Sequence, residues 1–239
     1  GIAGYYPLMA VEAGMVGMAF TNARPSIAPT FSVQPMLGTN PIAFGAPTDE
    51  ACPFLFDAAT SITQRGKYEV LARKGIPAKP GWAINNKGEN ITDAEEVLQG
   101  FARDAAALLP LGGAGEDLAG YKGYGLATIV EILSASLQQG KFLWDLSGIG
   151  ANGQPQPNAL GHFFMAIQVE AFCALEDFKH STGEIIRQLR AAHKAPGASQ
   201  IFSAGEKEYI SEMETSKTGI PVVPNLQKDI KVMQEALEL

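Results

Sequence analysis

Cysteine is scarce in this sequence, and its scarcity excludes two classes of protein. The 239 residues include 2 cysteines, Cys52 and Cys173, which lie far apart in the chain. They form neither the spacing of a metal site nor the framework of a disulfide-rich domain. We therefore expect no metal site and a reducing compartment, the cytoplasm.

Positive charge and long apolar runs are also in short supply. The chain has 18 Lys and Arg against 25 Asp and Glu, a net charge of -7. Because no basic stripe is available to neutralise phosphates, we expect no nucleic-acid partner. No apolar run reaches the length of a membrane span, and no signal-peptide pattern is present, so we expect no membrane partner. The first residues already read as a helix in progress, and we expect further residues before Gly1.

Two common catalytic motifs are missing, and two glycine-rich segments resemble nucleotide-binding motifs without the residues that such motifs need. The sequence has neither G-x-S-x-G nor H-E-x-x-H. Residues 148–153 fit G-x-G-x-x-G, but the following Gln-Pro-Gln-Pro cannot open the helix that a dinucleotide fingerprint needs, so we expect a surface loop. Residues 115–122 resemble a P-loop, but the lysine is one place late and no Ser or Thr follows it. Phosphoryl transfer is therefore not expected.

Apolar segments alternate with helical patterns along the chain. Strands are expected at residues 15–21, 41–46, 53–57 and 163–169. Helices are expected at residues 5–13, from a Thr60-Ser61 cap to 74, from Asp93 towards 109, at 126–137, at 176–193 and in two segments after 206. A glycine-rich loop is expected at 112–125. Three strands follow one another without helices between them, so we predict the α/β class with a mixed sheet flanked by helices.

Small and polar residues gather at the ends of these strands and helices. The segments are Thr21–Pro25, Gly38–Pro41, Asp57–Ser61 and Lys122–Gly125. Ligands of open α/β sheets bind in crevices at strand ends, and small residues let a cofactor approach the backbone. The alternative is that these segments are turns and helix caps only.

Histidine and arginine offer few candidates for acid–base chemistry or anion binding. His162 opens a predicted strand, so it is a candidate site residue, with a structural role as the alternative. His180, Arg187 and Arg190 lie on a predicted helix surface, where we expect them to be solvated. Arg24 joins His162 as a candidate only if the sheet brings the two together.

Taken together, the ordered motifs resemble one family, the type-2 malate/L-lactate dehydrogenases. The resemblance rests on Met36-Leu37-Gly38-Thr39-Asn40-Pro41, Phe56-Asp57-Ala58-Ala59-Thr60-Ser61, Leu108-Leu109-Pro110-Leu111-Gly112-Gly113, Lys122-Gly123-Tyr124-Gly125 and Gly161-His162-Phe163-Phe164. It extends from Gly1 to about residue 169 and more weakly to the end of the chain.

The resemblance implies a fold, a cofactor and a reaction. The fold is that of the L-sulfolactate dehydrogenases, a mixed sheet that is not the usual Rossmann fold. Residues 1–170 would form most of the NAD(P)-binding domain, and 171–239 a helical portion that packs back on it. NAD or NADP would serve the interconversion of a 2-hydroxy acid and its 2-oxo acid, with malate as the first guess. The family is usually homodimeric.

Particular residues follow from the resemblance. The expected cofactor-binding residues are Asn22, Ala23, Asp57, Ala58, Ala59, Lys122 and Gly123. The substrate-side candidates are Gly38, Thr39 and Asn40. Family members often carry Ser at the position of Ala23, so one hydroxyl contact with the nicotinamide half is lost here.

The catalytic residues of the family are not matched in this chain. The resemblance implies that the catalytic histidine and the substrate-binding arginine lie upstream of Gly1, so we expect the isolated chain to be inactive. Two alternatives stay open. One is an inactive cofactor-binding or structural fragment, and the other is a cyclic-imine reductase or ureidoglycolate dehydrogenase of the same family.

Overall fold

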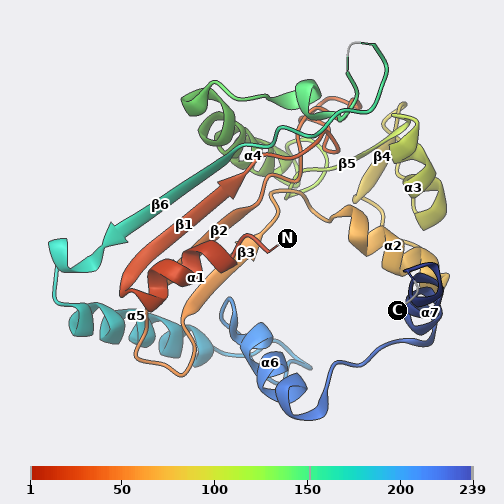
Figure 1. The fold of residues 1–239 in the computed structure, drawn as a ribbon. Coiled ribbons are helices and arrows are strands. Elements are labelled where there is room, and N and C mark those ends of the chain that lie inside the picture. Colours follow the sequence, from red (N-terminus) through yellow and green to blue (C-terminus); the bar gives the residue numbers. More distant parts are fainter. Residues whose placement is uncertain (1, 151, 238–239) are drawn as a thin grey trace.

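Four antiparallel strands form the main sheet of the computed structural model, which describes residues 2–150 and 152–237. The strands are β1 (Met15–Thr21), β2 (Ile42–Ala46), β3 (Phe54–Ala58) and β6 (His162–Gln168). They lie side by side in the order β3-β2-β1-β6 (Figure 1). Thr21 pairs with His162, and Ile42 pairs with Ala58. One end of the sheet therefore gathers the end of β1, the start of β2, the end of β3 and the start of β6.

Helix α1 (Tyr5–Glu12) covers one face of this sheet, and two glycines let it come close. Gly17 and Gly45 are partners across β1 and β2. A Cβ added to Gly17 would lie 2.7 Å from the Cα of Pro7, and one added to Gly45 would lie 2.8 Å from Cγ2 of Val11. The helix thus packs nearly backbone to backbone on the sheet, a contact that a side chain would block.

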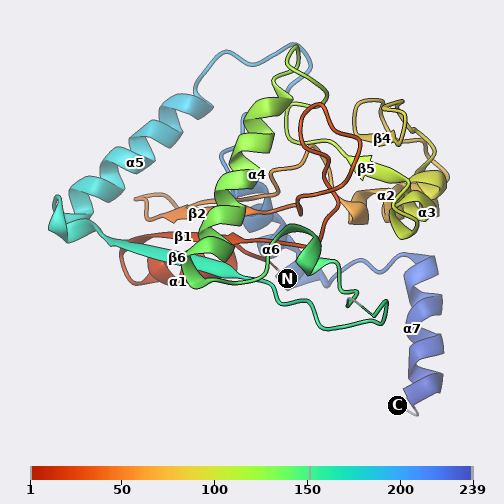
Figure 2. The same cartoon turned by 90° about the horizontal axis from the view of Figure 1, so that it is seen from above.

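Helices α4 (Gly120–Ala135) and α5 (Leu175–Arg190) lie on the opposite face (Figure 2). Successive side chains of a strand point to opposite faces, so Val16 and Ala46 face away from α1. They are buried together with Val169, and Phe178 of α5 packs against them. The centre of the sheet, β1 and β2, is therefore covered on both faces, whereas β6 at the edge is largely exposed.

A second core lies beside the sheet. It is built from α2 (Arg65–Lys74), β4 (Ala83–Asn85), α3 (Ala94–Ala102) and β5 (Ala106–Leu108), with β4 and β5 antiparallel. Tyr68 is fully buried at its centre and meets the rings of Trp82 and Phe101 edge-on, at 6.3 and 6.1 Å between centroids. Asp93 caps α3 by accepting a hydrogen bond from the amide of Glu96 at 2.8 Å.

Two further helices complete the chain, α6 (Glu206–Thr218) and α7 (Pro224–Leu237). The edge of β3 meets the segment before α6, where the amide of Leu55 donates to the carbonyl of Ala204 at 3.2 Å. Helix α7 stands apart from the sheet and its helices (Figure 2). Across residues 2–150 and 152–237, no helix has both the length and the apolar character needed to cross a membrane.

The predicted fold class is confirmed, and so are the predicted strands to within a residue or two. Each pair of strands in the two sheets is antiparallel, and a parallel pairing occurs in the isolated bridge between Ile27 and Leu108. The prediction of a non-Rossmann fold is also confirmed by this strand order.

Three predicted boundaries are wrong. Helix α2 begins at Arg65 and not after Thr60, because the hydroxyl of Thr60 donates to the carbonyls of Thr39 and Asn40 and does not cap the helix. Helix α3 ends at Ala102, because the chain reverses at Asp104 (φ 52°) and continues as β5. The glycine-rich loop expected at 112–125 ends early, since α4 begins at Gly120.

Candidate functional site

A large cavity opens where β3 ends. This β3 cavity has a volume of about 1040 Å³, and Asp57, Ala58 and Ala59 form part of its wall. Lys67 of α2 and Lys79 of the following loop also line it. The cavity therefore combines two small side chains, one carboxylate and two ammonium groups.

A second cavity adjoins the first at the same end of the sheet. This β6 cavity, of about 900 Å³, is lined by Thr21, Asn22, Ala23 and His162, together with the start of α1. Both cavities share the wall residues Ile2, Ala3, Thr39 and Pro41. An elongated ligand can thus extend from the end of β3 to the start of β6.

A third, smaller cavity of about 450 Å³ lies next to these two. It is lined by Arg24, Arg65 and, again, Thr39. Thr39, one of the predicted substrate-side residues, therefore lines all three cavities.

The buried carboxylate of Glu131 organises the loops around these cavities, and the sequence analysis did not single it out. Glu131 lies on α4 and is 7% exposed. Its Oε2 accepts from Nδ2 of Asn40 at 2.8 Å, and its Oε1 accepts from Nδ2 of Asn22 at 3.3 Å and from the amide of Leu143 at 3.0 Å. A lone charge inside the apolar helical run 126–137 was the signal that could have found it.

Asn22 and Asn40 are fully buried and bind other parts of the protein. Oδ1 of Asn22 accepts from the amide of Gly161 at 2.7 Å, and Oδ1 of Asn40 accepts from the amide of Ala23 at 3.0 Å. Because both amide groups are occupied in this way, the two side chains position the loops that line the cavities. Asn22 reaches the β6 cavity wall, whereas Asn40 lies behind it.

Gly38 and Gly123 permit close packing. A Cβ on Gly38 would lie 2.3 Å from the carbonyl oxygen of Ala23, and one on Gly123 would lie 2.3 Å from the carbonyl oxygen of Leu111. Both residues therefore let backbone meet backbone next to the site. Neither lines the three cavities described above.

Lys122 does not share the β3 cavity with Asp57, Ala58 and Ala59. It is exposed on α4, with its Nζ 5.9 Å from the ring centre of Tyr121, and it does not line the three cavities.

Asp57 is held by the start of the chain. The amide of Gly4 donates to its Oδ2 at 2.7 Å. The amide of Thr60, three residues further along the chain, donates to the carbonyl of Thr39 at 3.0 Å. The second carboxylate oxygen of Asp57 faces no donor among the described hydrogen bonds.

His162 sits on the wall of the β6 cavity, bound to a neighbouring strand. Its Nδ1 lies 2.9 Å from the hydroxyl of Thr21, and its ring stacks on Phe164 at 6.0 Å between centroids. Arg24 lines the third cavity and not this one. His162 and Arg24 therefore line different cavities.

The glycine motif at residues 148–153 forms a loop. The amide of Gly150 donates to the carbonyl of Gln154 at 2.8 Å, and Ile149 forms an isolated bridge with Pro155. Ala151, which belongs to the motif, is outside the described residues. No helix follows the motif in the described part of 147–161, so it lacks the context of a dinucleotide fingerprint.

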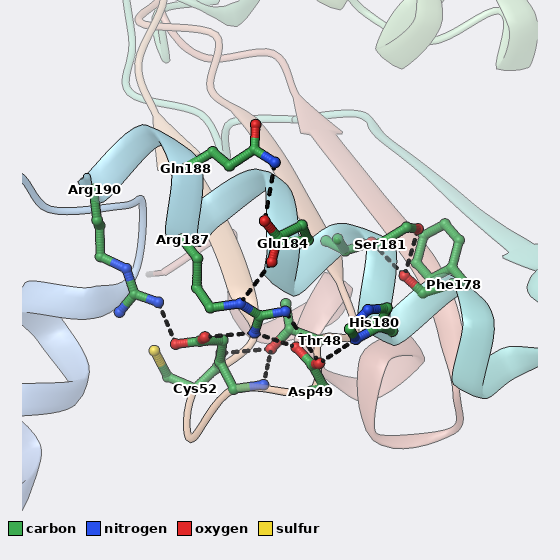
Figure 3. A network of polar contacts seen from close by, with 12 residues as sticks. Thr48, Asp49, Cys52, Phe178, His180, Ser181, Glu184, Arg187, Gln188 and Arg190 are labelled. Carbon is green, nitrogen blue, oxygen red and sulfur yellow. Dashed lines mark hydrogen bonds and ion pairs between the residues drawn. The ribbon is translucent and has the colours of Figure 1, made fainter. Parts of the chain in front are cut away.

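A dense ionic network ties α5 to the loop between β2 and β3 (Figure 3). Its members line none of the three cavities described above. Arg187 binds Asp49 at 2.9 Å and Glu50 at 2.8 Å, and Arg190 binds Glu50 as well. His180 lies 3.1 Å from Asp49. The expectation of a solvated side chain holds for His180, which is 74% exposed. It is wrong for Arg190, which is 27% exposed and is bound by a loop far away in sequence.

The network perturbs the acidity of its members. Hydrogen bonds from Arg190 and then Arg187 hold the pKa of Glu50 below its usual value. Burial acts to raise the pKa of Glu206, but hydrogen bonds from Ser203 and the charge of Arg190 lower it overall. Both carboxylates therefore stay ionised in the folded protein to a lower pH than in the unfolded chain.

Comparison with known proteins places this architecture in context. The family described as malate/L-lactate dehydrogenase matches residues 1–231. A malate dehydrogenase of Pyrococcus horikoshii is 44% identical over 96% of this chain and 61% of its own length. A crystal structure of malate dehydrogenase from Entamoeba histolytica, 41% identical, superposes with a TM-score of 0.94 over 100% of this chain and 66% of that one.

More distant relatives carry another activity in their names. A delta(1)-pyrroline-2-carboxylate reductase of Ancylobacter novellus is 32% identical over 94% of this chain and 60% of its own length. The chain thus spans about three fifths of the length of the curated relatives described here.

Proposed function

The chain belongs to the malate/L-lactate dehydrogenase family, and we propose that it forms the cofactor-binding part of an NAD(P)-dependent 2-hydroxy-acid dehydrogenase. The observation that carries this proposal is the junction of the β3 and β6 cavities at Thr39 and Pro41. Residues that the resemblance assigns to the cofactor line the cavities on either side of this junction, Asp57–Ala59 in the β3 cavity and Ala23 in the β6 cavity.

The residues present fit a nicotinamide dinucleotide. The carboxylate oxygen of Asp57 that has no donor among the described residues suits a ribose hydroxyl, and the small side chains of Ala58 and Ala59 allow close approach. Lys67 and Lys79 offer point charges for phosphates in the same cavity. The bound dinucleotide supplies or accepts a hydride, and the chain's own residues hold and orient it.

Reduction of the substrate requires two catalytic groups besides the cofactor. Reduction of a 2-oxo acid requires a proton donor at the carbonyl oxygen and a cation that holds the carboxylate. Among the described residues, His162 is the histidine on the cavity walls, and no arginine lines the β3 or β6 cavity. We infer that the 239-residue polypeptide binds the cofactor without turning over substrate, which keeps the fragment alternative open for the isolated chain.

Malate is the proposed substrate of the parent enzyme. The identity to a malate dehydrogenase, 44%, exceeds that to a cyclic-imine reductase, 32%, and so supports a hydroxy acid over an imine. We further propose a cytoplasmic homodimer, with residues 1–170 forming most of the cofactor domain and 171–239 a helical portion that packs on it. The cofactor is proposed as NAD or NADP.

Cofactor binding provides the direct test. Trp82 lines the β3 cavity, so quenching of its fluorescence during titration with NADH and NADPH reports occupancy there. The Trp144→Phe background removes the other tryptophan of the chain. We expect saturable quenching by at least one of the two dinucleotides, and its absence with both would overturn the proposal.

Three lysine variants locate the phosphates. Lys67→Ala is expected to weaken binding about tenfold, since a hydrogen bond to a charged group contributes about 1.5–3 kcal/mol. Lys122→Ala should weaken it in the same direction if the contact implied by the resemblance exists. Lys228→Ala on α7 is the charge-matched control and should leave affinity unchanged. A loss in Lys122→Ala alone would move the phosphate site from the β3 cavity to α4.

A further inference from the structure

Three loops form the walls of the two large cavities, and they are linked to one another by a chain of hydrogen bonds. The loop after β1 contributes Ala23, the loop before β2 contributes Thr39, and the loop after β3 contributes Ala59. The hydroxyl of Thr60 donates to the carbonyl of Asn40 at 3.0 Å, and Oδ1 of Asn40 accepts from the amide of Ala23 at 3.0 Å. A displacement of one loop is therefore transmitted to the other two.

The linked loops are held by one acceptor group. Both carboxylate oxygens of Glu131 are occupied, one by Asn40 and the other by Asn22 and the amide of Leu143. The donors are all neutral N–H groups, and Glu131 takes part in none of the ion pairs among the described residues. A buried carboxylate without a cation depends on such donors, and the donors in turn depend on an acceptor with two free oxygens.

The backbone conformation of Asn40 also depends on these hydrogen bonds. Its backbone has φ 35°, in the left-handed region that non-glycine residues seldom adopt. The neighbouring Gly38 is pressed against the carbonyl of Ala23. The side-chain bonds of Asn40 to Glu131 and to the carbonyl of Ala127, at 2.8 and 3.0 Å, hold this conformation.

We propose that Glu131 is a positioning residue, which sets the shape of the cofactor cavities by holding Asn22 and Asn40 from behind. It touches neither cavity itself, so it acts on the ligand only through the loops. The proposal rests on the proposed function, because the ligand whose affinity it controls is the nicotinamide dinucleotide.

An amide in place of this carboxylate breaks the pattern of donors and acceptors. In Glu131→Gln, an NH₂ group replaces one carboxylate oxygen. It then faces either the NH₂ group of Asn40 or the two donors on the other side, which are the NH₂ group of Asn22 and the amide of Leu143. We expect affinity for the preferred dinucleotide to fall about tenfold or more, as for loss of a hydrogen bond to a charged group. Glu214→Gln on the exposed surface of α6 makes the same chemical change as a control and should bind like the parent chain.

Moving the carboxylate from residue 131 to residue 40 distinguishes a positioning role from a general effect on stability. In the double variant Glu131→Gln with Asn40→Asp, the new NH₂ group can donate to the new carboxylate, while the other oxygen still accepts from Asn22 and Leu143. We expect Asn40→Asp alone to weaken binding, because it sets two carboxylates against each other and removes the bond from Asn40 to the carbonyl of Ala127. The double variant should bind better than Asn40→Asp alone, because it relieves the first of these two effects. Two losses that simply add would overturn the proposal.

A third variant with a smaller structural change tests the proposal even if the variants of Glu131 and Asn40 do not fold. Thr60→Val keeps the volume of the side chain but removes the hydroxyl that joins the loop after β3 to Asn40. We expect about a threefold to tenfold loss of affinity, in line with one neutral hydrogen bond. The backbone bond from the Thr60 amide to the carbonyl of Thr39 remains in this variant, so unchanged affinity would contradict a role for the hydroxyl bond to Asn40 in positioning the ligand. If the parent chain binds neither dinucleotide, the proposed function fails, whereas binding that is equal in the parent and in Glu131→Gln refutes the role of Glu131 alone.

Discussion

Two glycines on the same helix should respond to alanine with opposite changes in stability. A Cβ on Gly123 would lie 2.3 Å from the carbonyl oxygen and 2.4 Å from the amide nitrogen of Leu111, and both atoms belong to backbone that cannot rotate away. A Cβ on Gly125, two residues further along α4, meets nothing within 4 Å. The two positions thus share a helix and differ in the space available.

The magnitudes follow from two effects. Alanine stabilises a helix interior by about 0.5–1 kcal/mol relative to glycine. Overpacking typically costs about 1–3 kcal/mol, and a clash with backbone belongs at the upper end of that range. Gly125→Ala should therefore gain up to about 1 kcal/mol in free energy of unfolding, and Gly123→Ala should lose about 1–2 kcal/mol net.

Thermal unfolding followed by circular dichroism measures both changes. For a chain of this size, 1 kcal/mol corresponds to about 2–4 °C in Tm. We expect a Tm raised by a few degrees in Gly125→Ala and lowered by a few degrees in Gly123→Ala. Equal gains in both variants would refute the argument that Gly123 is required by packing against Leu111. A fall in cofactor affinity in Gly123→Ala with an unchanged Tm would instead favour the direct cofactor contact implied by the resemblance.

Three further predictions concern other parts of the chain. Gly150→Ala should change NADH affinity by less than about twofold, because a surface-loop substitution typically costs little, and a hundredfold loss in a titration would return the pyrophosphate to this loop. The stability contributed by Glu50, whose pKa is lowered from 4.5 in the folded protein, is present above about pH 4.5 and is lost as the pH falls through the lowered value. Urea unfolding at pH 7, 4.5 and 3.5 should show this loss in the parent chain and a smaller one in Glu50→Gln, so equal pH dependence in the two would contradict it. Finally, the 239-residue polypeptide should show no NADH- or NADPH-dependent reduction of oxaloacetate, pyruvate or a wider set of 2-oxo acids, and robust turnover that is abolished by His162→Ala would identify His162 as the proton donor.

The strands were predictable because their signal is local. Residues 15–21 and 42–46 are apolar runs bounded by Gly, Asn and Pro, and both form strands as expected. The end of α3 was not predictable in this way, because the reversal at Asp104 places a residue without special sequence marks at φ 52°. The start of α2 was missed because Thr60 looks like a helix cap but binds carbonyl groups more than 15 residues earlier in the chain.

The candidate site was predictable in its location and less so in its parts. The polar segments after β1, before β2 and after β3 do meet at one end of the sheet. What the sequence could not distinguish is which side chains face the cavities and which hold the loops from behind. Asn22 and Asn40 look like ligand-binding residues in the sequence. In the structure both bind Glu131, which lies on a helix about ninety or more residues further along the chain.

The pairing of β1 with β6 affects how the chain folds during its synthesis. Thr21 and His162 are 141 residues apart, so β1 has β2 on one side long before its other neighbour leaves the ribosome. Until then, Met15–Thr21 presents an open, largely apolar edge of the kind that pairs with other chains. Closing so long a loop is slow relative to forming local contacts. Nascent chains truncated before residue 162 should therefore bind chaperones and aggregate, whereas chains that extend past residue 168 can shield that edge within the same molecule.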